Sequence, residues 1–152
     1  MKIPLFFLAI FFSFSTFLCA QEKKFNQKLA DSLGADQYGM KAYVIVILKT
    51  GTAKITDKDL LDKHFKGHME NIGKLVTEGK LIVAGPFSGK NDLNYRGIFI
   101  FNVKTKEEAK ALVKSDPAVA AGLFSYEILP WYGSAALPLY LKHHDEISKE
   151  QH

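Results

Sequence analysis

Hydrophobic and polar positions along the middle of the chain alternate in two periods, one typical of strands and one of helices. A run of β-branched and aromatic residues at 43–48 has no polar interruption and predicts a central strand. Between 57 and 78 apolar residues recur at helical spacing, and either Thr56 or Asp57 can cap the start of this helix. The first half of the pattern therefore predicts a strand followed by a long helix.

The second half of the pattern predicts a hairpin, another helix and a last strand. Short apolar runs at 80–84 and 97–103 flank a turn-rich loop, as the two strands of a hairpin do. A second helix begins at Thr105 and must end before Pro117, because proline disfavours helical geometry in the residue that precedes it. An apolar run at 124–129 predicts the fourth strand.

The order βαββαβ is typical of an α+β ferredoxin-like fold, in which an antiparallel four-stranded sheet carries its helices on one face. The other face must be covered by something else. The strand at 43–48 is apolar at both parities, and residues 98–101 are four consecutive large apolar residues. We therefore expect a homodimer that packs sheet against sheet.

The N-terminus has the layout of a secretory signal peptide. Lys2 precedes an apolar run at 3–12, hydroxyl residues follow, and Ala20 offers a small residue for cleavage. A membrane span would need about 20 apolar residues, more than this run provides. The alternative is a lipoprotein anchored through Cys19, although residues 16–18 lack the small side chains expected before an acylated cysteine.

Cleavage after Ala20 changes the composition in two ways. It removes Lys2, so the net charge falls from +4 to +3, and it removes Cys19, the single cysteine of the chain. The mature chain can then form no disulfide and use no thiol in catalysis. A mildly basic surface of mixed sign does not indicate nucleic acid as a partner, and no membrane association is expected after cleavage.

These features predict four segments. A signal peptide at 1–20 and a polar lead-in segment at 21–39 precede a single domain at 40–132, and a tail occupies 133–152. The tail contains a short apolar stretch that can form an extra edge strand or an arm that clasps a partner. It can equally be a loosely ordered terminus.

Two polar residues stand out within the predicted domain. His68 lies on the apolar stripe of the first helix, where an isolated histidine usually serves as a hydrogen-bonded packing residue. Asp116 precedes Pro117 and has a complete structural explanation as the N-cap of a short helical turn. Because both helices lie on the same face of the sheet, Asp116 can also approach His68, fix its tautomer and equip it as a general acid or base.

Two separated stretches resemble the YCII-related (YciI-like) family. Residues 67–75 and 78–86 look like that family's helix histidine followed by a gly-leu strand and an ala-gly-pro turn. Residues 115–123, which lead to Ile128-Leu129-Pro130-Trp131, look like its asp-pro segment and last strand. The resemblance covers roughly residues 41–132 and keeps both stretches in the same order.

The resemblance implies a dimeric α+β barrel whose pocket contains a histidine and an aspartate, matching His68 and Asp116. Activities associated with the family and its wider fold group are dehydrochlorination of a chlorinated hydroxyquinol and lactone isomerisation. Both reactions move a proton on a small cyclic substrate without a cofactor. This chain departs from the family in its signal peptide, its tail and Ala118, where relatives often carry an aromatic residue.

Other candidate residues give weaker signals. His64 and His68 have a spacing that can hold a metal, but no third ligand is visible, so we expect no metal site. Phosphate-loop patterns are missing from the sequence, which gives nucleotide cofactors no support. Trp131 and Tyr132 can line the mouth of a pocket or pack in a dimer, and Arg96 can meet an anionic substrate group or remain a solvated cation.

Two functional hypotheses follow. The first is an exported, cofactor-independent lyase or isomerase that binds a small cyclic molecule, with His68 as proton shuttle and Asp116 as its orienting partner. The second is a non-catalytic dimeric module of the cell envelope for ligand binding or assembly. Under the second hypothesis, His68 and Asp116 would be separated or packed against unrelated partners.

Overall fold

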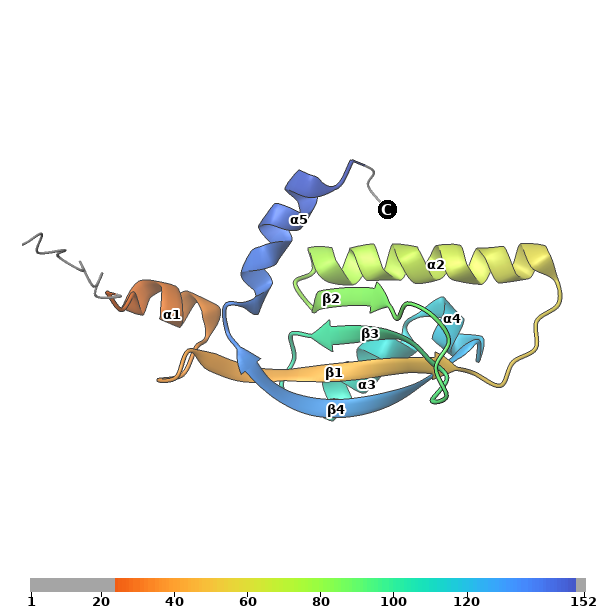
Figure 1. Ribbon diagram of the computed structural model, residues 1–152, viewed down its shortest axis with the longest axis horizontal. Helices are drawn as coiled ribbons and strands as arrows, with labels where there is room; N and C mark the ends of the chain where they lie inside the picture. Colours follow the sequence, from red (N-terminus) through yellow and green to blue (C-terminus); the bar gives the residue numbers. More distant parts are fainter. Residues whose placement is uncertain (1–23, 150–152) are drawn as a thin grey trace, which may run out of the picture.

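The computed structural model describes residues 24–149, so the predicted signal peptide lies outside the described part of the chain. Four strands form one sheet: β1 (Met40–Thr50), β2 (Leu81–Pro86), β3 (Tyr95–Phe101) and β4 (Phe124–Ser134). The helices are α1 (Gln27–Leu33), α2 (Lys58–Thr77), α3 (Lys106–Lys114), α4 (Pro117–Ala120), the 3₁₀ helix η1 (Leu137–Tyr140) and α5 (Leu141–Ile147) (Figure 1).

The strands lie in the order β2-β3-β1-β4, and each pairs with its neighbours in antiparallel fashion. This arrangement confirms the predicted α+β ferredoxin-like fold, including the β2-β3 hairpin. The first and last strands in the sequence, β1 and β4, were predicted too short. β1 and β4 pair without interruption from Met40 opposite Ser134 to Thr50 opposite Phe124, so both strands continue well beyond their apolar runs.

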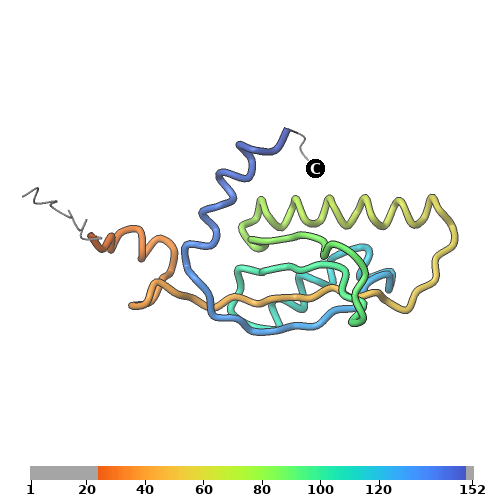
Figure 2. The backbone as a smooth tube through the Cα atoms, in the orientation of Figure 1, coloured from red at the N-terminus to blue at the C-terminus, as the bar shows by residue number. Residues whose placement is uncertain are grey.

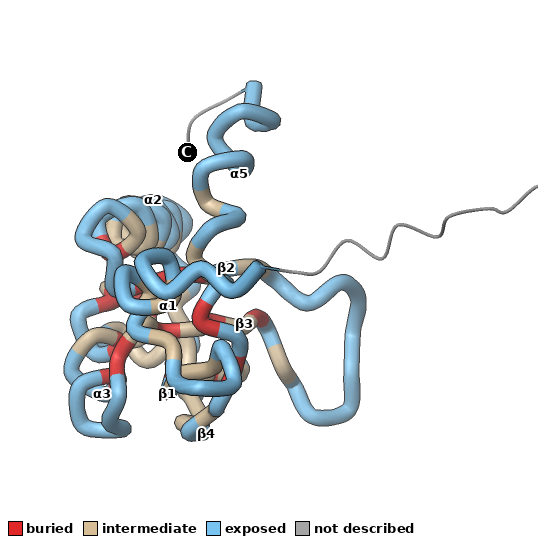
Figure 3. Tube along the Cα trace, turned by 90° about the vertical axis from the view of Figure 1, so that its left-hand side faces the viewer, coloured by how far each residue is buried: buried red, intermediate tan, exposed pale blue. Residues whose placement is uncertain are grey.

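Alternate residues of the sheet face the helices and form the core. Val44, Val46 and Leu48 of β1 pack beside Phe99 and Phe101 of β3, and all five side chains are buried. From above, α2 contributes Leu75, and α3 contributes Ala109 and Val113. Both long helices therefore cover the same face of the sheet, as Figure 3 shows.

The other face of the sheet is also apolar along its centre. Ile45 and Ile47 of β1 alternate with the core residues and lie opposite Ile100 and Ile98 of β3. On the other side of β1, Leu129 of β4 pairs with Ile45 and is 45% exposed. This set of residues, called the open face below, explains why the central strands show no polar side in the sequence.

Local capping sets where each helix starts. The side chain of Asp57 accepts a hydrogen bond from Leu60 N and caps α2, which decides between the two caps that the sequence allowed. Thr105 and Glu108 form a capping box, which confirms the predicted start of α3 at Thr105. These bonds fix the ends of α2 and α3 and, with them, the residues that each helix turns toward the sheet.

Both ends of the described chain form helices that extend beyond the sheet (Figure 2). The tail does not form the extra edge strand that was one of its predicted alternatives. β4 itself continues to Ser134, and the chain then enters η1 and α5. Pro138 lies in the first turn of η1 and has no N–H with which to join a strand ladder. Tyr140 anchors the segment by donating its hydroxyl proton to Ile82 O.

Within residues 24–149, no helix is both long and apolar enough to cross a membrane.

The core predicts a clear contrast between two phenylalanines. Phe101 is fully buried, so Phe101→Ala should lower the free energy of unfolding by about 3–5 kcal/mol through lost burial and a residual cavity. Phe25 is 70% exposed, and Phe25→Ala should change it by no more than about 0.5 kcal/mol. Urea denaturation of both variants measures the difference, and equal losses would contradict this assignment of the core.

Candidate functional site

Asp116 is the most deeply buried charged residue of the described chain, with no exposed surface. It lies between α3 and α4, where Pro117 occupies the first helical position of α4. One carboxylate oxygen, Oδ1, accepts hydrogen bonds from Ala118 N at 2.9 Å and Val119 N at 3.3 Å. The predicted N-cap is therefore present, and it uses only half of the carboxylate.

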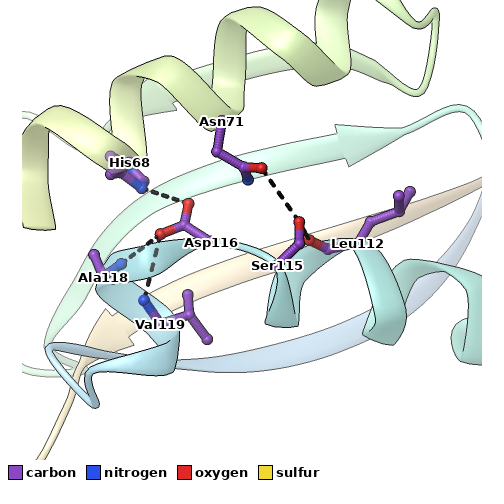
Figure 4. Close-up of polar contacts among 7 residues, drawn as sticks. All are labelled: His68, Asn71, Leu112, Ser115, Asp116, Ala118 and Val119. Carbon is purple, nitrogen blue, oxygen red and sulfur yellow. Dashed lines mark hydrogen bonds and ion pairs between the residues drawn. The ribbon is translucent and has the colours of Figure 1, made fainter.

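The second oxygen of Asp116 meets His68. His68 lies in the middle of α2 and directs Nδ1 toward Asp116 Oδ2 at 2.6 Å (Figure 4). Its side chain is 13% exposed. The two residues are 48 positions apart in sequence and come together because α2 and α4 lie on the same face of the sheet.

This geometry assigns different tasks to the two ring nitrogens of His68. A carboxylate only accepts hydrogen bonds, so Nδ1 carries the proton that it donates to Asp116. Within residues 24–149, no protein group makes a hydrogen bond with Nε2. Nε2 is therefore the atom that can accept or give a proton, in a ring whose orientation is fixed by its other nitrogen.

Two aromatic rings contact the imidazole of His68, one against its face and one edge-on. Phe99 of β3 stacks on the imidazole with ring centroids 5.9 Å apart, and Phe124 of β4 contacts it edge-on at 5.4 Å. Phe65, one turn before His68 on α2, contacts Phe124 at 5.9 Å and is 37% exposed. The imidazole is thus surrounded by apolar rings, with Phe65 at the solvent-facing rim.

An open hollow of about 430 Å³ lies between α2 and the start of α4, and its lining includes Gly67, the residue before His68, and Pro117, the residue after Asp116. His64 belongs to this hollow and not to the pair, and Lys63 and Lys66 line the hollow beside it. Glu70 also lines the hollow and forms an ion pair of 3.9 Å with Lys66, and among the described residues no three potential metal ligands come together. His68 bonds Asp116 through Nδ1, whereas His64 lines the hollow, so the two histidines of α2 do not form a common metal site.

Trp131 and Tyr132 lie far from His68. Both belong to β4, seven and eight residues after Phe124, which corresponds to roughly 25 Å along an extended strand. Trp131 packs on Tyr43 with ring centroids 5.6 Å apart, and its ring covers Gly133 so closely that a Cβ there would lie 2.4 Å from it. The Tyr132 hydroxyl donates to Asp36 Oδ2 and ties the lead-in segment to the sheet.

Arg96 is exposed at the start of β3, where the pairing with β1 is irregular. Its carbonyl oxygen accepts a hydrogen bond from Phe87 N at 3.0 Å and holds the loop between β2 and β3. Among the described residues, no carboxylate forms an ion pair with its guanidinium group. The structure thus brings together His68 and Asp116 and leaves Arg96, Trp131 and Tyr132 outside their contacts.

Sequence reasoning missed several residues that surround the pair. Phe99 and Phe124 looked like ordinary strand residues, and only the sheet register shows that both face His68. Asn71 is three residues after His68 and Ser115 immediately precedes Asp116, and the two form a hydrogen bond of 3.2 Å. The helical spacing of Asn71 from His68 was the one signal in the sequence for this second link.

Fold and site together define a class, the α+β ferredoxin-like proteins with a buried histidine and aspartate pair on the helical face. Residues 42–132, more than half of the chain, match the model of the YCII-related domain. The chain belongs to the YCII-related domain family.

Two known proteins are similar to this chain. YjpA, an uncharacterized protein of Bacillus subtilis, is 29% identical over 89 residues, which cover 59% of this chain and 94% of YjpA. Among solved structures, 5-chloro-2-hydroxyhydroquinone dehydrochlorinase from Burkholderia phenoliruptrix, in complex with 2,5-dihydroxybenzoquinone, is 21% identical. The match covers 58% of this chain and 92% of the dehydrochlorinase chain, with a TM-score of 0.42.

The Tyr132–Asp36 bond makes a testable electrostatic prediction. Accepting the Tyr132 hydroxyl proton, together with the Met40 N–H, lowers the pKa of Asp36 below its ordinary value of 3.8. The contribution of this bond to stability is therefore present above that ordinary value and is lost as the pH falls through the lowered pKa. Tyr132→Phe should return the pKa of Asp36 toward 3.8, as measured by carboxyl NMR titration.

Tyr38→Phe provides the matched control, because the Tyr38 ring is 76% exposed and only its backbone N–H bonds Asp36. It should leave the pKa of Asp36 where it is. A Tyr132→Phe variant in which Asp36 titrates as in the wild type would show that the hydroxyl does not hold the lead-in segment.

Proposed function

We propose that this protein is a cofactor-independent enzyme that moves a proton on a small organic molecule, with His68 as the general acid–base group. The observation that carries this proposal is the 2.6 Å contact between His68 Nδ1 and the buried carboxylate of Asp116. That contact leaves Nε2 as the working nitrogen. A base whose tautomer and orientation are fixed by a third group is the arrangement that general acid–base catalysis requires.

The proposed step follows from the two nitrogens. Nε2 accepts a proton from a carbon of the substrate, and the electron pair of the broken C–H bond forms a new double bond. In a lyase this double bond forms as the neighbouring carbon loses a leaving group with its bonding electrons. In an isomerase an existing double bond of the substrate shifts by one position, and Nε2 returns the proton to the carbon that receives its electron pair. The buried Asp116 carboxylate stabilises the imidazolium that exists between the two halves of the step.

The surroundings of His68 support a planar or cyclic substrate. Phe99 and Phe124 contact the imidazole, and Phe65 extends the aromatic wall toward solvent. Flat apolar rings favour flat ligands that stack or make edge-to-face contacts with them. No metal or organic cofactor is needed for the step, because histidine supplies both the base and the acid.

This mechanism predicts large losses of activity without loss of the fold. His68→Ala removes the proton acceptor and should lower turnover by about 10²- to 10⁴-fold. Asp116→Asn keeps the N-cap oxygen but faces Nδ1 with an amide N–H, which requires Nδ1 to accept and so moves the ring proton to Nε2. Its loss of turnover should therefore be of the same order.

Two measurements check this prediction. Ring ¹⁵N NMR should show a proton on Nδ1 of His68 in the wild type and on Nε2 in Asp116→Asn. Turnover is followed with a panel of lactones, cyclic ketones and chlorinated phenols, as isomerisation, solvent deuterium incorporation or chloride release. His64→Ala is the matched control, and a loss of turnover equal to that of His68→Ala would contradict the assignment.

We also infer that the open face is covered by a second copy of this chain. Ile45, Ile47, Ile98 and Ile100 form a continuous apolar surface with Leu129 at its side. Lys49 and Glu127 form an ion pair of 2.8 Å at one end of the surface, and both side chains remain partly exposed, at 33% and 43%. In a two-fold interface the same patch meets its own copy, so an apolar patch is complementary to itself, and charges that are already paired within one copy add no like-charge repulsion.

The dimer is tested by placing a charge at its centre. Ile98→Lys should convert the protein to a monomer in light scattering coupled to gel filtration, because a buried, unpaired ammonium group would oppose association. Ile147→Lys, on α5 and 79% exposed, makes the same substitution away from the sheet and should leave the dimer intact. A monomeric wild type, or a dimeric Ile98→Lys variant that remains folded, would contradict the inference.

Turnover measurements on the dimer separate the two functional hypotheses. A dimer whose His68→Ala variant retains every measured property favours the non-catalytic assembly module. A dimer that loses turnover only on substitution of His68 or Asp116 favours the enzyme.

A further inference from the structure

Three contacts join α2 to the segment around Asp116, and they follow one another in matching order. Gly67 meets Pro117, His68 meets Asp116, and Asn71 meets Ser115. Residue numbers rise along α2 as they fall along the facing segment, so the three contacts lie side by side along one seam, here called the α2–α4 seam. Figure 4 shows the last two contacts within this seam.

The first contact depends on the absence of a side chain at Gly67. A Cβ at this position would lie 2.9 Å from Cγ and 3.2 Å from Cβ of Pro117. The proline ring cannot rotate away, because it is closed onto its own backbone at the start of α4. Any residue other than glycine would therefore push α2 and α4 apart.

The size of this displacement can be compared with the hydrogen bond beside it. Carbon atoms pack at about 3.5–4.0 Å, so an added Cβ requires a shift of roughly 0.6–1 Å. His68 is the next residue along α2, and its bond to Asp116 measures 2.6 Å. A shift of that size takes the bond to or beyond the upper limit of about 3.2 Å for a good N–H···O bond.

Gly73 provides a comparison, because it is a second glycine of α2 without a close neighbour. It lies on the same helix, is exposed, and a Cβ there would meet nothing within 4 Å. Glycine in a helix interior is destabilising relative to alanine. Both glycines thus lower the stability of the helix relative to alanine, but only Gly67 has a close contact, with Pro117, that requires glycine at its position.

The third contact fixes the other side of His68. Ser115 ends α3, and its single hydroxyl proton is shared between two acceptors, Leu112 O at 2.7 Å and the side-chain oxygen of Asn71 at 3.2 Å. The Leu112 contact holds the hydroxyl in place, so the amide of Asn71 meets a fixed partner. This link opposes rotation of α2 about its axis, a motion that the Gly67–Pro117 contact alone would permit.

We propose that Gly67 and Asn71 are positioning residues of the His68–Asp116 pair. Gly67 sets how closely α2 approaches α4, and Asn71, through Ser115, sets the rotation of α2. Neither residue touches the reacting atoms; each acts by holding His68 Nδ1 at bonding distance from Asp116. The consequence for catalysis rests on the proposed function, whereas the consequence for the hydrogen bond does not.

The experiment compares Gly67→Ala with Gly73→Ala. The reporter is the proton on His68 Nδ1, observed by NMR through its chemical shift and its exchange with water. In Gly67→Ala the signal should move upfield and exchange at least about tenfold faster, because the bond lengthens past its good range. In Gly73→Ala the signal should stay unchanged and the urea midpoint should rise, because alanine favours the helix.

A compensating variant separates this role from general loss of structure. Pro117→Ala removes the ring carbon that lies 2.9 Å away, so Gly67→Ala/Pro117→Ala should regain most of the wild-type signal. Asn71→Ala keeps a good helix former and tests the second link; it should speed exchange of the same proton. If Gly67→Ala and Asn71→Ala both leave the Nδ1 proton as in the wild type, the proposal is overturned.

Turnover is measured separately with the substrate panel described above. A displacement near 1 Å at a reacting group can cost about 10²-fold in rate, so Gly67→Ala should lower kcat far more than it changes KM. If the Nδ1 signal weakens in Gly67→Ala but the wild type turns over none of these substrates, the positioning role stands and the proposed enzyme activity is contradicted. If the signal in Gly67→Ala is normal and the wild type is active, the enzyme stands and the positioning role is contradicted.

Discussion

The buried carboxylate of Asp116 is the constraint on which this structure depends. An unpaired charge without solvent contact would be strongly destabilising, so the hydrogen bonds that stabilise the carboxylate have to be supplied by the protein. Two backbone N–H groups of α4 and the imidazole of His68 supply them. The break between α3 and α4 and the close approach of α2 both serve this one group, and the pair that results is also the site with the clearest chemistry.

The sheet separates this chemistry from the surface on which we expect association. Residues of one parity, such as Val46, face the helices and the pair, whereas residues of the other parity, such as Ile47, face away. Phe99 belongs to the first set and Ile98 to the second, although they are neighbours in sequence. A substitution can therefore change one face and leave the other in place, which keeps the two functional hypotheses experimentally distinct.

Local patterns in the sequence were sufficient for the fold and for the two polar residues of the pair. The strand and helix order, the stripe that carries His68 and the cap formed by Asp116 each depend on residues close together in the chain. The position of Trp131 and Tyr132 was not accessible in this way, because it depends on the full pairing of β4 with β1, which continues to Ser134. The role of Gly67 was equally hidden, since nothing near it in sequence indicates that Pro117 lies against it.

The two nitrogens of His68 have different surroundings, and this difference supports the proposed role of the residue as a proton carrier. A histidine that serves only the core usually has both ring nitrogens bonded, because an unsatisfied buried polar atom is destabilising. His68 has one nitrogen bonded at 2.6 Å and, within the described chain, no protein partner for the other, while 13% of its side chain remains exposed. A proton carrier needs both halves of this asymmetry, a fixed nitrogen to orient the ring and a free one to meet the substrate.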